Sequence, residues 1–426
     1  MRRAILLLLG MTLLSACRPS QLMRTDLPAK CQQPDTHALL QVARESLVLE
    51  AYRPRTIYDL DATNRPVPFL ANPLAADALA VLSYPEPRRF AGGDRDFARM
   101  AHRSFLYDNA LVVLWLVHEG DLARARRVLA TIAALQRPDG AWGFGFNAGV
   151  DDGYYNAAYV RTGTVAWVVY ALAHYRSASR DARYDAVLER ATRWLLAQRD
   201  APSDLFFAGS GRWIDAAHFQ PQWPARFFAT EHQIDTWFAL QAVTHAWPAL
   251  AQAQHLPGVA RALAAAIQQR LWLPDEQRFA QGQAGSHLDA TSALDAAGTW
   301  SALWLLAQGD AVRARQALAW VTAQHAVVAR GWNGLRPYRD APPETWFVEA
   351  SIAQPLAHAR MGQREVAQQQ WLPLAQLACA GGLPVVYAPD WHADFPFTPA
   401  TAPTIWWLIA AEEIADGGAP WLWAER

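Results

Sequence analysis

The chain has no excess of either charge and contains few cysteines. Its 426 residues carry 38 Lys and Arg against 39 Asp and Glu, a formal net charge of −1. No basic stripe interleaved with aromatic residues follows the chain, so a nucleic-acid partner is not expected. The three cysteines, Cys17, Cys31 and Cys379, form no CxxC motif and no cluster with histidine. We therefore expect neither a metal site nor a cofactor.

The apolar run at the N-terminus is too short to span a membrane. Residues 4–16 supply little more than half of the roughly 20 residues that a spanning helix needs. The run follows Arg2 and Arg3 and ends in Leu14-Ser15-Ala16-Cys17, which resembles the lipobox of bacterial lipoproteins. We expect residues 1–17 to be a signal peptide and Cys17 to carry acyl chains such as palmitate. An ordinary secretory signal containing a cysteine is the alternative.

The residues after Cys17 bear on location and redox state. Arg18, rather than aspartate, follows the lipobox, so the expected location is the outer membrane, facing the periplasm. Residues 18–35, with their Pro, Gln and Ser, are predicted to be a short tether. In an oxidising compartment Cys31 and Cys379 can form a disulfide, although two buried thiols would give the same sequence.

From Thr36 onward helical periodicity dominates, which predicts an all-α chain. Mostly apolar helices alternate with amphipathic ones, and the starts of the apolar helices are spaced by roughly 55 to 70 residues. The apolar helices begin near Phe105, Thr162, Thr230, Ala290, Thr345 and Ala402, and the amphipathic ones near Asp121, Arg180, Pro257, Asp310 and Gln363. A helix over residues 36–51 supplies the missing sixth partner. We predict one (α/α)6 toroid over residues 36–426; an open helical solenoid, with its shorter repeat, is the alternative.

Long loops connect each amphipathic helix to the next apolar helix and are expected to share one face of the toroid. Long structured loops in a compact domain are usually functional. Nine acidic residues stand at or near the starts of the apolar helices: Asp108, Asp151, Asp152, Glu231, Asp235, Asp289, Asp295, Glu344 and Glu349. A carboxylate in such apolar surroundings is costly unless it has a partner or a function. Glu231 and Asp235 are four residues apart and share one helical face, although N-terminal capping by Thr230 would also account for Glu231.

Tryptophan is abundant, with 20 residues in the chain. Several tryptophans lie outside the most periodic helical stretches, namely Trp142, Trp213, Trp223, Trp332 and Trp391. Core packing is one interpretation, and stacking on the apolar faces of sugar rings is the other. Because these residues gather in the long loops, we expect Trp142, Trp213, Trp332 and Trp391 to bind a carbohydrate.

Four ordered blocks resemble those of bacterial six-hairpin glycosidase-like proteins. They are Tyr107-Asp108-Asn109-Ala110-Leu111, Thr230 to Asp235, Trp346 to Gln354 and Thr401 to Trp407. The resemblance implies an (α/α)6 toroid with a carbohydrate-handling cleft at the long-loop face. One departure is Ala350, which stands where the family pattern has a glycine and adds a Cβ near the expected cleft, while Glu349 and Gln354 are retained.

These observations favour a periplasmic glycoside hydrolase, with a lyase less favoured, that acts on an exopolysaccharide or envelope glycan. Hydrolysis needs two carboxyl groups that flank the scissile bond. We expect Glu231 to be the general acid and Glu349 the general base of an inverting reaction, with Asp108, Asp152 and Asp235 binding substrate. The alternatives are a non-catalytic carbohydrate-binding lipoprotein that supports polysaccharide export or assembly, and a helical scaffold for another protein.

Overall fold

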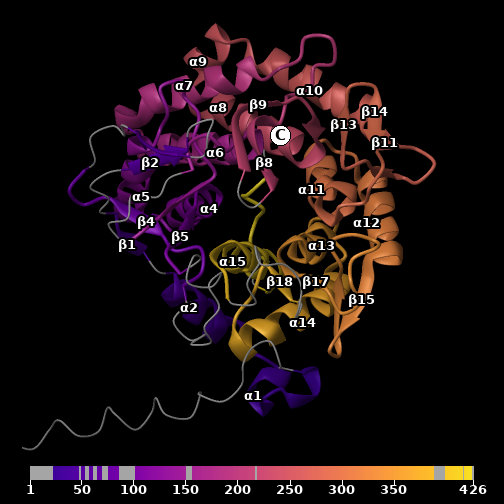
Figure 1. The fold of residues 1–426 in the computed structure, drawn as a ribbon. Coiled ribbons are helices and arrows are strands. Elements are labelled where there is room, and N and C mark those ends of the chain that lie inside the picture. Colours follow the sequence, from indigo (N-terminus) through magenta and orange to yellow (C-terminus); the bar gives the residue numbers. More distant parts are fainter. Residues whose placement is uncertain are drawn as a thin grey trace, which may run out of the picture.

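The computed structural model describes residues 23–47, 49–52, 57–60, 65–69, 75–85, 101–149, 156–215, 218–387, 399–415 and 417–424. Six helical segments form an inner ring (Figure 1). They are α4 (Leu106–His118), α6 (Thr162–Ser179), α8 (Thr230–Ala246), α11 (Trp300–Ala307) with the π-helical turn η5 (Asp295–Thr299), α13 (Val348–Arg360) and α15 (Thr401–Ala415). Each packs on the next, and α15 packs back on α4, so the ring is closed.

Outer helices cover this ring. They are α5 (Leu122–Ala134), α7 (Asp185–Ala197), α10 (Leu256–Arg270), α12 (Ala311–His325), α14 (Arg364–Gly381) and α2 (Thr36–Ser46). The inner helices α4 and α15 are buried on nearly all sides, whereas α5 and α7 bury one face each. Helix α2 packs on α14 and α15 and supplies the sixth outer position. The all-α toroid predicted from helix order is confirmed.

Short antiparallel strands stand immediately before four inner helices. They are β5 (Arg103–Phe105), β7 (Val160–Arg161), β10 (Phe228–Ala229) and β17 (Trp346–Phe347). Their partners are β6 (Gly145–Asn147), β8 (Gly209–Asp215) with β9 (His218–Ala225), β13 (Gly282–Ala284) with β14 (His287–Asp289), and β18 (Val386–Tyr387). The other two-stranded sheets pair β1 (Leu49–Ala51) with β4 (Leu79–Val81), β2 (Ile57–Leu60) with β3 (Pro66–Phe69), β11 (Trp272–Leu273) with β12 (Arg278–Phe279), and β15 (Ala326–Ala329) with β16 (Trp332–Leu335).

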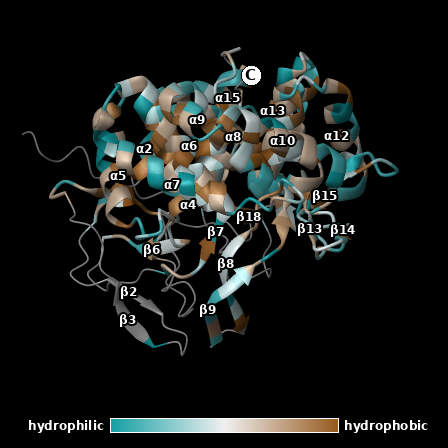
Figure 2. Ribbon diagram, turned by 90° about the horizontal axis from the view of Figure 1, so that it is seen from above, coloured by the Kyte–Doolittle hydropathy of each residue, from teal (hydrophilic) through white to brown (hydrophobic). Residues whose placement is uncertain are grey.

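The strands gather on one side of the helical layer, opposite the C-terminal end of the chain (Figure 2). Threonine hydroxyls fix the starts of three inner helices to this side. Thr162 donates to the carbonyl of Phe207 at 2.5 Å, and Thr230 to that of Ala280 at 2.6 Å. Thr401 donates to the carbonyl of Leu82 at 2.7 Å. The N-terminal turns of the inner helices are therefore held at the face that the loops build.

The N-terminal segment is attached to the rim of the toroid. Cys31, in α1 (Ala29–Gln32), forms a disulfide with Cys379 in α14. The backbone N–H of Arg24, in the turn η2 (Arg24–Asp26), donates to the carbonyl of Arg330 at 3.1 Å. Residues 24–32 of the segment predicted to be a tether thus belong to the folded body, while Cys17 lies outside the described residues. None of the described helices is both long and apolar enough to span a membrane.

Candidate active site

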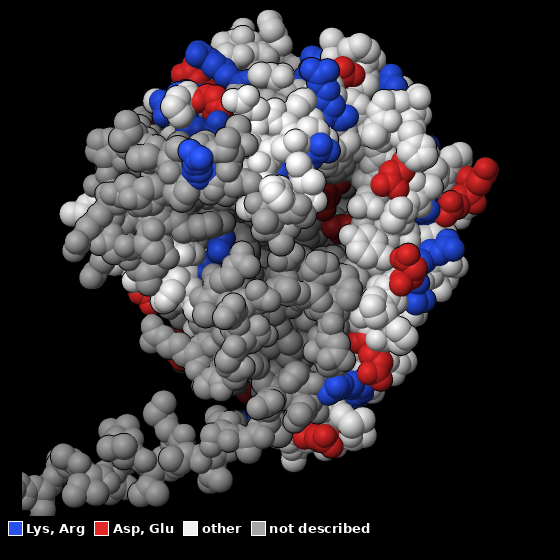
Figure 3. Space-filling model, viewed as in Figure 1, with Lys and Arg blue, Asp and Glu red and all other residues white. Residues whose placement is uncertain are grey.

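Five carboxyl groups meet at the loop-face ends of neighbouring inner helices. Asp108 lies in the first turn of α4, Glu231 and Asp235 lie in α8, Asp295 begins η5, and Glu349 lies in the first turn of α13. Figure 3 shows acidic atoms deep in the hollow near the middle of this face. Four of the five are buried, with Asp108, Asp235, Asp295 and Glu349 between 4% and 8% exposed. The Glu231 side chain is 36% exposed and forms the accessible edge of the group.

A two-step hydrogen-bond chain orients Glu349. The indole Nε1 of Trp406, in α15, donates to the Tyr107 hydroxyl at 2.7 Å. That hydroxyl in turn donates to Glu349 Oε1 at 2.8 Å. Trp406 is fully buried, so its N–H has no access to bulk water. Three inner helices, α15, α4 and α13, thus cooperate to hold one carboxyl group.

The second helical turn of α8 places Asp235 against α6. The Trp167 indole, from α6, lies beside the Asp235 carboxyl group and lowers its pKa in part, while Asp235 Oδ1 has no hydrogen-bond partner within the described structure. Close packing of the two helices depends on Gly163. A Cβ there would lie 2.5 Å from His232 Cδ2 and 2.7 Å from Asp235 Oδ2. The missing side chain at Gly163 therefore makes room for two site residues.

Glu231 and Asp295 form a coupled carboxyl pair. The two side chains lie close together, and a proton on one of them relieves the repulsion between two carboxylates. Desolvation in the hollow, and then the Asp295 carboxylate, raise the pKa of Glu231 well above its usual range. His232 Nε2 lies 3.5 Å from Glu231 Oε1, but burial, and then Arg161, lower the pKa of His232 to about 3. The imidazole is therefore neutral and does not offset the negative charge.

Burial dominates the remaining carboxyl groups. It raises the pKa of Asp108 to about 7 and that of Asp235 well above its usual range. Burial also raises the pKa of Glu349 to about 8, although the hydrogen bond from Tyr107 lowers it in part. No arginine or lysine in the described part of the chain forms an ion pair with these five groups. The site can therefore hold several protons at neutral pH and supply both proton donors and a proton acceptor.

The structure brings together some predicted residues and separates others. Asp108, Glu231, Asp235 and Glu349 share the hollow, whereas Asp289 is partly exposed in β14 and Glu344 is exposed in the loop before β17. Asp151, Asp152 and Trp391 lie outside the described residues. Among the described histidine, cysteine, aspartate and glutamate side chains, no three are arranged to hold a metal ion.

The proposed stacking residues Trp142 and Trp332 are corrected by the structure. Both side chains are fully buried, and Trp142 Nε1 donates to the carbonyl of Ile132 at 2.7 Å. Neither presents a ring face to a ligand, because each fills the core beneath its loop. Trp213 is different: it is 44% exposed on β8 and packs on Phe219 at a tilt of 47°, with ring centroids 4.9 Å apart. Ala350 is also buried, among core residues such as Leu294, so its Cβ does not line the hollow.

Sequence reasoning missed several members of the site. Asp295 was recognised as an acidic residue near a helix start but was given no role. Tyr107 stood inside a recognised block next to Asp108, and Trp167 and Trp406 stood inside apolar helices. Nothing in their spacing distinguishes an indole that contacts a site residue from one that only packs. Their roles depend on contacts between helices that are far apart in sequence.

Comparison with known proteins supports the fold. No protein-family model matches the sequence, and no curated protein matches it. A D-mannose isomerase structure matches with a TM-score of 0.59 at 11% identity, covering 92% of this chain and 100% of that one. A wild-type glycosidase matches with a TM-score of 0.56 at 15% identity, over 90% and 99% of the two chains. A rhamnosidase from Klebsiella oxytoca with rhamnose bound gives 0.50 at 16% identity, over 79% and 60%. The chain therefore has the (α/α)6 toroid fold of six-hairpin glycosidase-like proteins.

Proposed function

We propose that the protein is a glycoside hydrolase that cleaves an exopolysaccharide or envelope glycan. The observation that carries this proposal is the group of five carboxyl groups in one hollow. Four of them are buried, and none has an arginine or lysine partner among the described residues. Such a group is costly for folding and is therefore expected where proton transfer is needed. The fold supports the proposal, because it is shared with a glycosidase and with a rhamnosidase that holds rhamnose.

The surroundings of the two glutamates suit different roles. Glu231 is the general acid: burial, and then the nearby Asp295, raise its pKa and keep a proton available for the leaving oxygen. Glu349 is the general base: the Tyr107 hydroxyl stabilises its ionised form and orients it. Asp108 and Asp235 bind sugar hydroxyls, and the unpartnered Asp235 Oδ1 is available for such a bond. We propose inversion at the anomeric carbon, with water activated by Glu349.

The test is a depolymerisation screen over envelope and exopolysaccharide glycans. Wild type is compared with Glu231→Gln and Glu349→Gln, and we expect each variant to lose about 100-fold or more in rate. The matched control is Glu344→Gln, which changes an exposed glutamate outside the hollow and should keep full activity. Proton NMR of the first product reports the anomer, and a retained configuration would contradict inversion. Full activity in both site variants would refute the assignment.

We also propose that the protein is exported and anchored by a lipid on Cys17, at the outer membrane and facing the periplasm. The Cys31–Cys379 disulfide supports export, because disulfides persist in oxidising compartments. A Cys17→Ser variant should lose labelling by radioactive palmitate and move from the membrane to the soluble fraction. Membrane retention of that variant would contradict the lipid anchor.

Binding without cleavage is the second candidate. It is favoured by the β8–β9 hairpin, which projects from the loop face (Figure 2). Trp213 is partly exposed there, and the Arg212 guanidinium lies 4.7 Å from the ring centroid of Trp223. Retention of a glycan in affinity electrophoresis, with no new reducing ends, would favour this function. Because a D-mannose isomerase shares the fold, the NMR assay also includes mannose.

A further inference from the structure

The segment after α15 enters the middle of the toroid. Residues 417–424, here called the plug, lie on the side opposite the strands, where the C-terminal end is marked (Figures 1 and 2). Leu422 is fully buried and Trp423 is 1% exposed. Trp423 adopts a left-handed backbone conformation with φ of 53°, which is uncommon for a bulky residue. The plug therefore closes the centre of the ring on the side opposite the strands.

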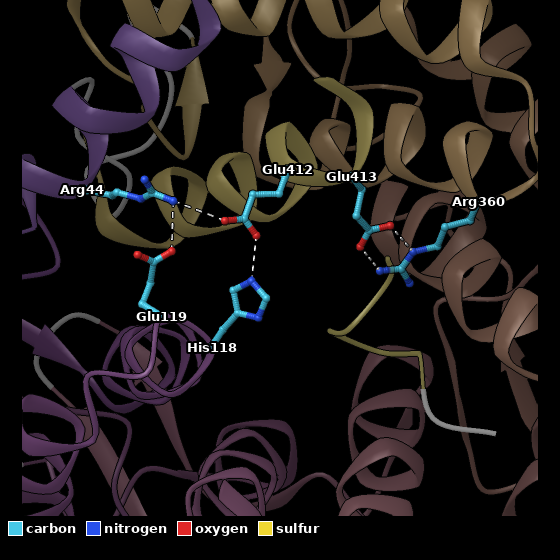
Figure 4. Close-up of polar contacts among 6 residues, drawn as sticks. All are labelled: Arg44, His118, Glu119, Arg360, Glu412 and Glu413. Atoms are coloured by element: carbon cyan, nitrogen blue, oxygen red, sulfur yellow. Dashed lines mark hydrogen bonds and ion pairs between the residues drawn. The ribbon is translucent and has the colours of Figure 1, made fainter. Parts of the chain in front are cut away.

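Arg360 and His118 contact both the end of α15 and the plug, and Figure 4 shows their contacts with Glu413 and Glu412 of α15. Arg360 donates to both carboxylate oxygens of Glu413, at 2.7 and 2.9 Å, and both side chains are almost fully buried. The same guanidinium donates to the carbonyls of Leu422 and Trp423, at 2.7 and 3.2 Å. His118 Nε2 lies 2.8 Å from Glu412, and its ring stacks on that of Trp421. A buried arginine that binds the plug backbone indicates a defined docked position.

The Trp423 indole contacts aromatic rings from four inner helices. Its ring centroid lies 4.8 Å from Phe238 of α8 and 5.1 Å from Trp167 of α6. It lies 5.3 Å from Trp406 of α15 and 5.8 Å from Trp300 of α11. Trp423 thus packs against four inner helices at once. Removing this ring would leave space into which its neighbours can move.

Two of these neighbours act on the site. Trp406 donates a hydrogen bond to Tyr107, which donates to Glu349, and Trp167 lies beside Asp235 and lowers its pKa in part. We propose that Trp423 is a positioning residue, which holds the indoles of Trp406 and Trp167 where they orient the carboxyl groups. The inference deepens the proposed function, because it concerns the same carboxyl groups.

The test measures the protonation of Glu349 without any substrate. An infrared difference spectrum between wild type and Glu349→Gln isolates the C=O stretch of the protonated carboxyl group, and its pH dependence gives a midpoint. The neighbouring titratable groups are Tyr107 and Asp108 of α4, Glu231 of α8 and Asp295 of η5. The same difference is then recorded in a Trp423→Leu background. We expect the midpoint to rise by about one pH unit, because the bond from Tyr107 favours the ionised form.

Trp371→Leu is the matched control. Trp371 is 5% exposed and stacks on Trp407 between α14 and α15, so its replacement damages the core away from the Tyr107 chain. We expect a similar loss of thermal stability from this control and no change in the midpoint. Trp423→Phe keeps an aromatic ring in the plug and should restore the wild-type midpoint.

The outcomes separate this inference from the proposed function. An unchanged midpoint in a folded Trp423→Leu variant, or an equal change in Trp371→Leu, would overturn the positioning role even if the protein cleaves glycans. A specific rise would support it even if no glycan is cleaved. Should Trp423→Leu fail to fold, Arg360→Lys loosens the plug while keeping its tryptophan. That variant should give a smaller rise in the same direction, and an unchanged midpoint would again refute the role.

Discussion

Replacing Glu349 by glutamine should stabilise the protein increasingly as pH rises. Burial raises the pKa of Glu349 from 4.5 to about 8, so the folded chain keeps a proton that the unfolded chain has lost between these values. The unfolded state then binds fewer protons, and wild-type stability falls as pH rises through this window. Glutamine is neutral at every pH and can still accept the hydrogen bond from Tyr107. The variant removes the proton linkage while keeping the local geometry.

The size of the effect follows from the same two pKa values. At about 1.36 kcal/mol per pH unit, the interval from 4.5 to about 8 corresponds to about 5 kcal/mol. This figure is an upper limit, because Asp108 also titrates in this hollow and shares the linkage. We expect Glu349→Gln and wild type to be equally stable at or below the lower value. The variant should gain a few kcal/mol above the upper value.

Urea unfolding measures this difference, with the disulfide kept oxidised and the pH stepped from below 4.5 to above 8. The free energy of unfolding of each protein is plotted against pH, and the two curves should diverge between these limits. Glu365→Gln controls for the loss of one negative charge, since Glu365 is exposed on α14. Parallel curves for wild type and Glu349→Gln would show that Glu349 keeps no extra proton in the folded state, which refutes the reasoning.

Three further predictions concern the site, the disulfide and pH. Gly163→Ala should lower the free energy of unfolding by about 1–3 kcal/mol and reduce activity, because its Cβ would overlap two α8 side chains. Gly258→Ala, on the open surface of α10, is the control and should change neither quantity in thermal melts and activity assays. Reduction of Cys31–Cys379 should lower the free energy of unfolding by about 2–5 kcal/mol and leave kcat unchanged, since the disulfide lies at the rim; a large loss of kcat would contradict this. Finally, kcat/KM should rise about tenfold per pH unit and level off near pH 8, where Glu349 ionises; a maximum at acidic pH would identify a different base.

The toroid could be predicted from sequence because each helix has its own recognisable hydrophobic pattern. The apolar helix at residues 106–118 and the amphipathic helix at residues 122–134 differ in pattern, and a glycine at position 120 separates them. The order of such pairs is enough to specify a closed ring. Strands β8 and β9 were missed for a physical reason. Their sequences, GSGRWID and HFQPQWPA, contain glycines and prolines and lack the apolar alternation that indicates a strand.

The site was predictable only in part. A carboxyl group at the start of an apolar helix is visible in sequence, which located Asp108, Glu231, Asp235 and Glu349. Tryptophan carries no comparable signal, because buried and exposed indoles occupy loops alike. Trp142 and Trp213 both stand in long loops, yet one is fully buried and the other is 44% exposed. The difference is set by which loops pack on one another, and that is a property of the closed ring.

Burial, and not the position at a helix N-terminus, determines the direction in which the pKa values of Asp108 and Glu349 shift. A helix N-terminus stabilises a nearby carboxylate by about 0.3–1 kcal/mol, rising to about 2 kcal/mol in partly buried sites. Burial of Asp108 and Glu349 opposes this effect and prevails, since both pKa values are raised to about 7 and 8. Protonated carboxyl groups that can donate a proton are therefore common in the hollow at neutral pH, whereas a carboxylate that can act as a base is rare. Tyr107 favours that species at Glu349, so the partners of Tyr107 determine how much base is available.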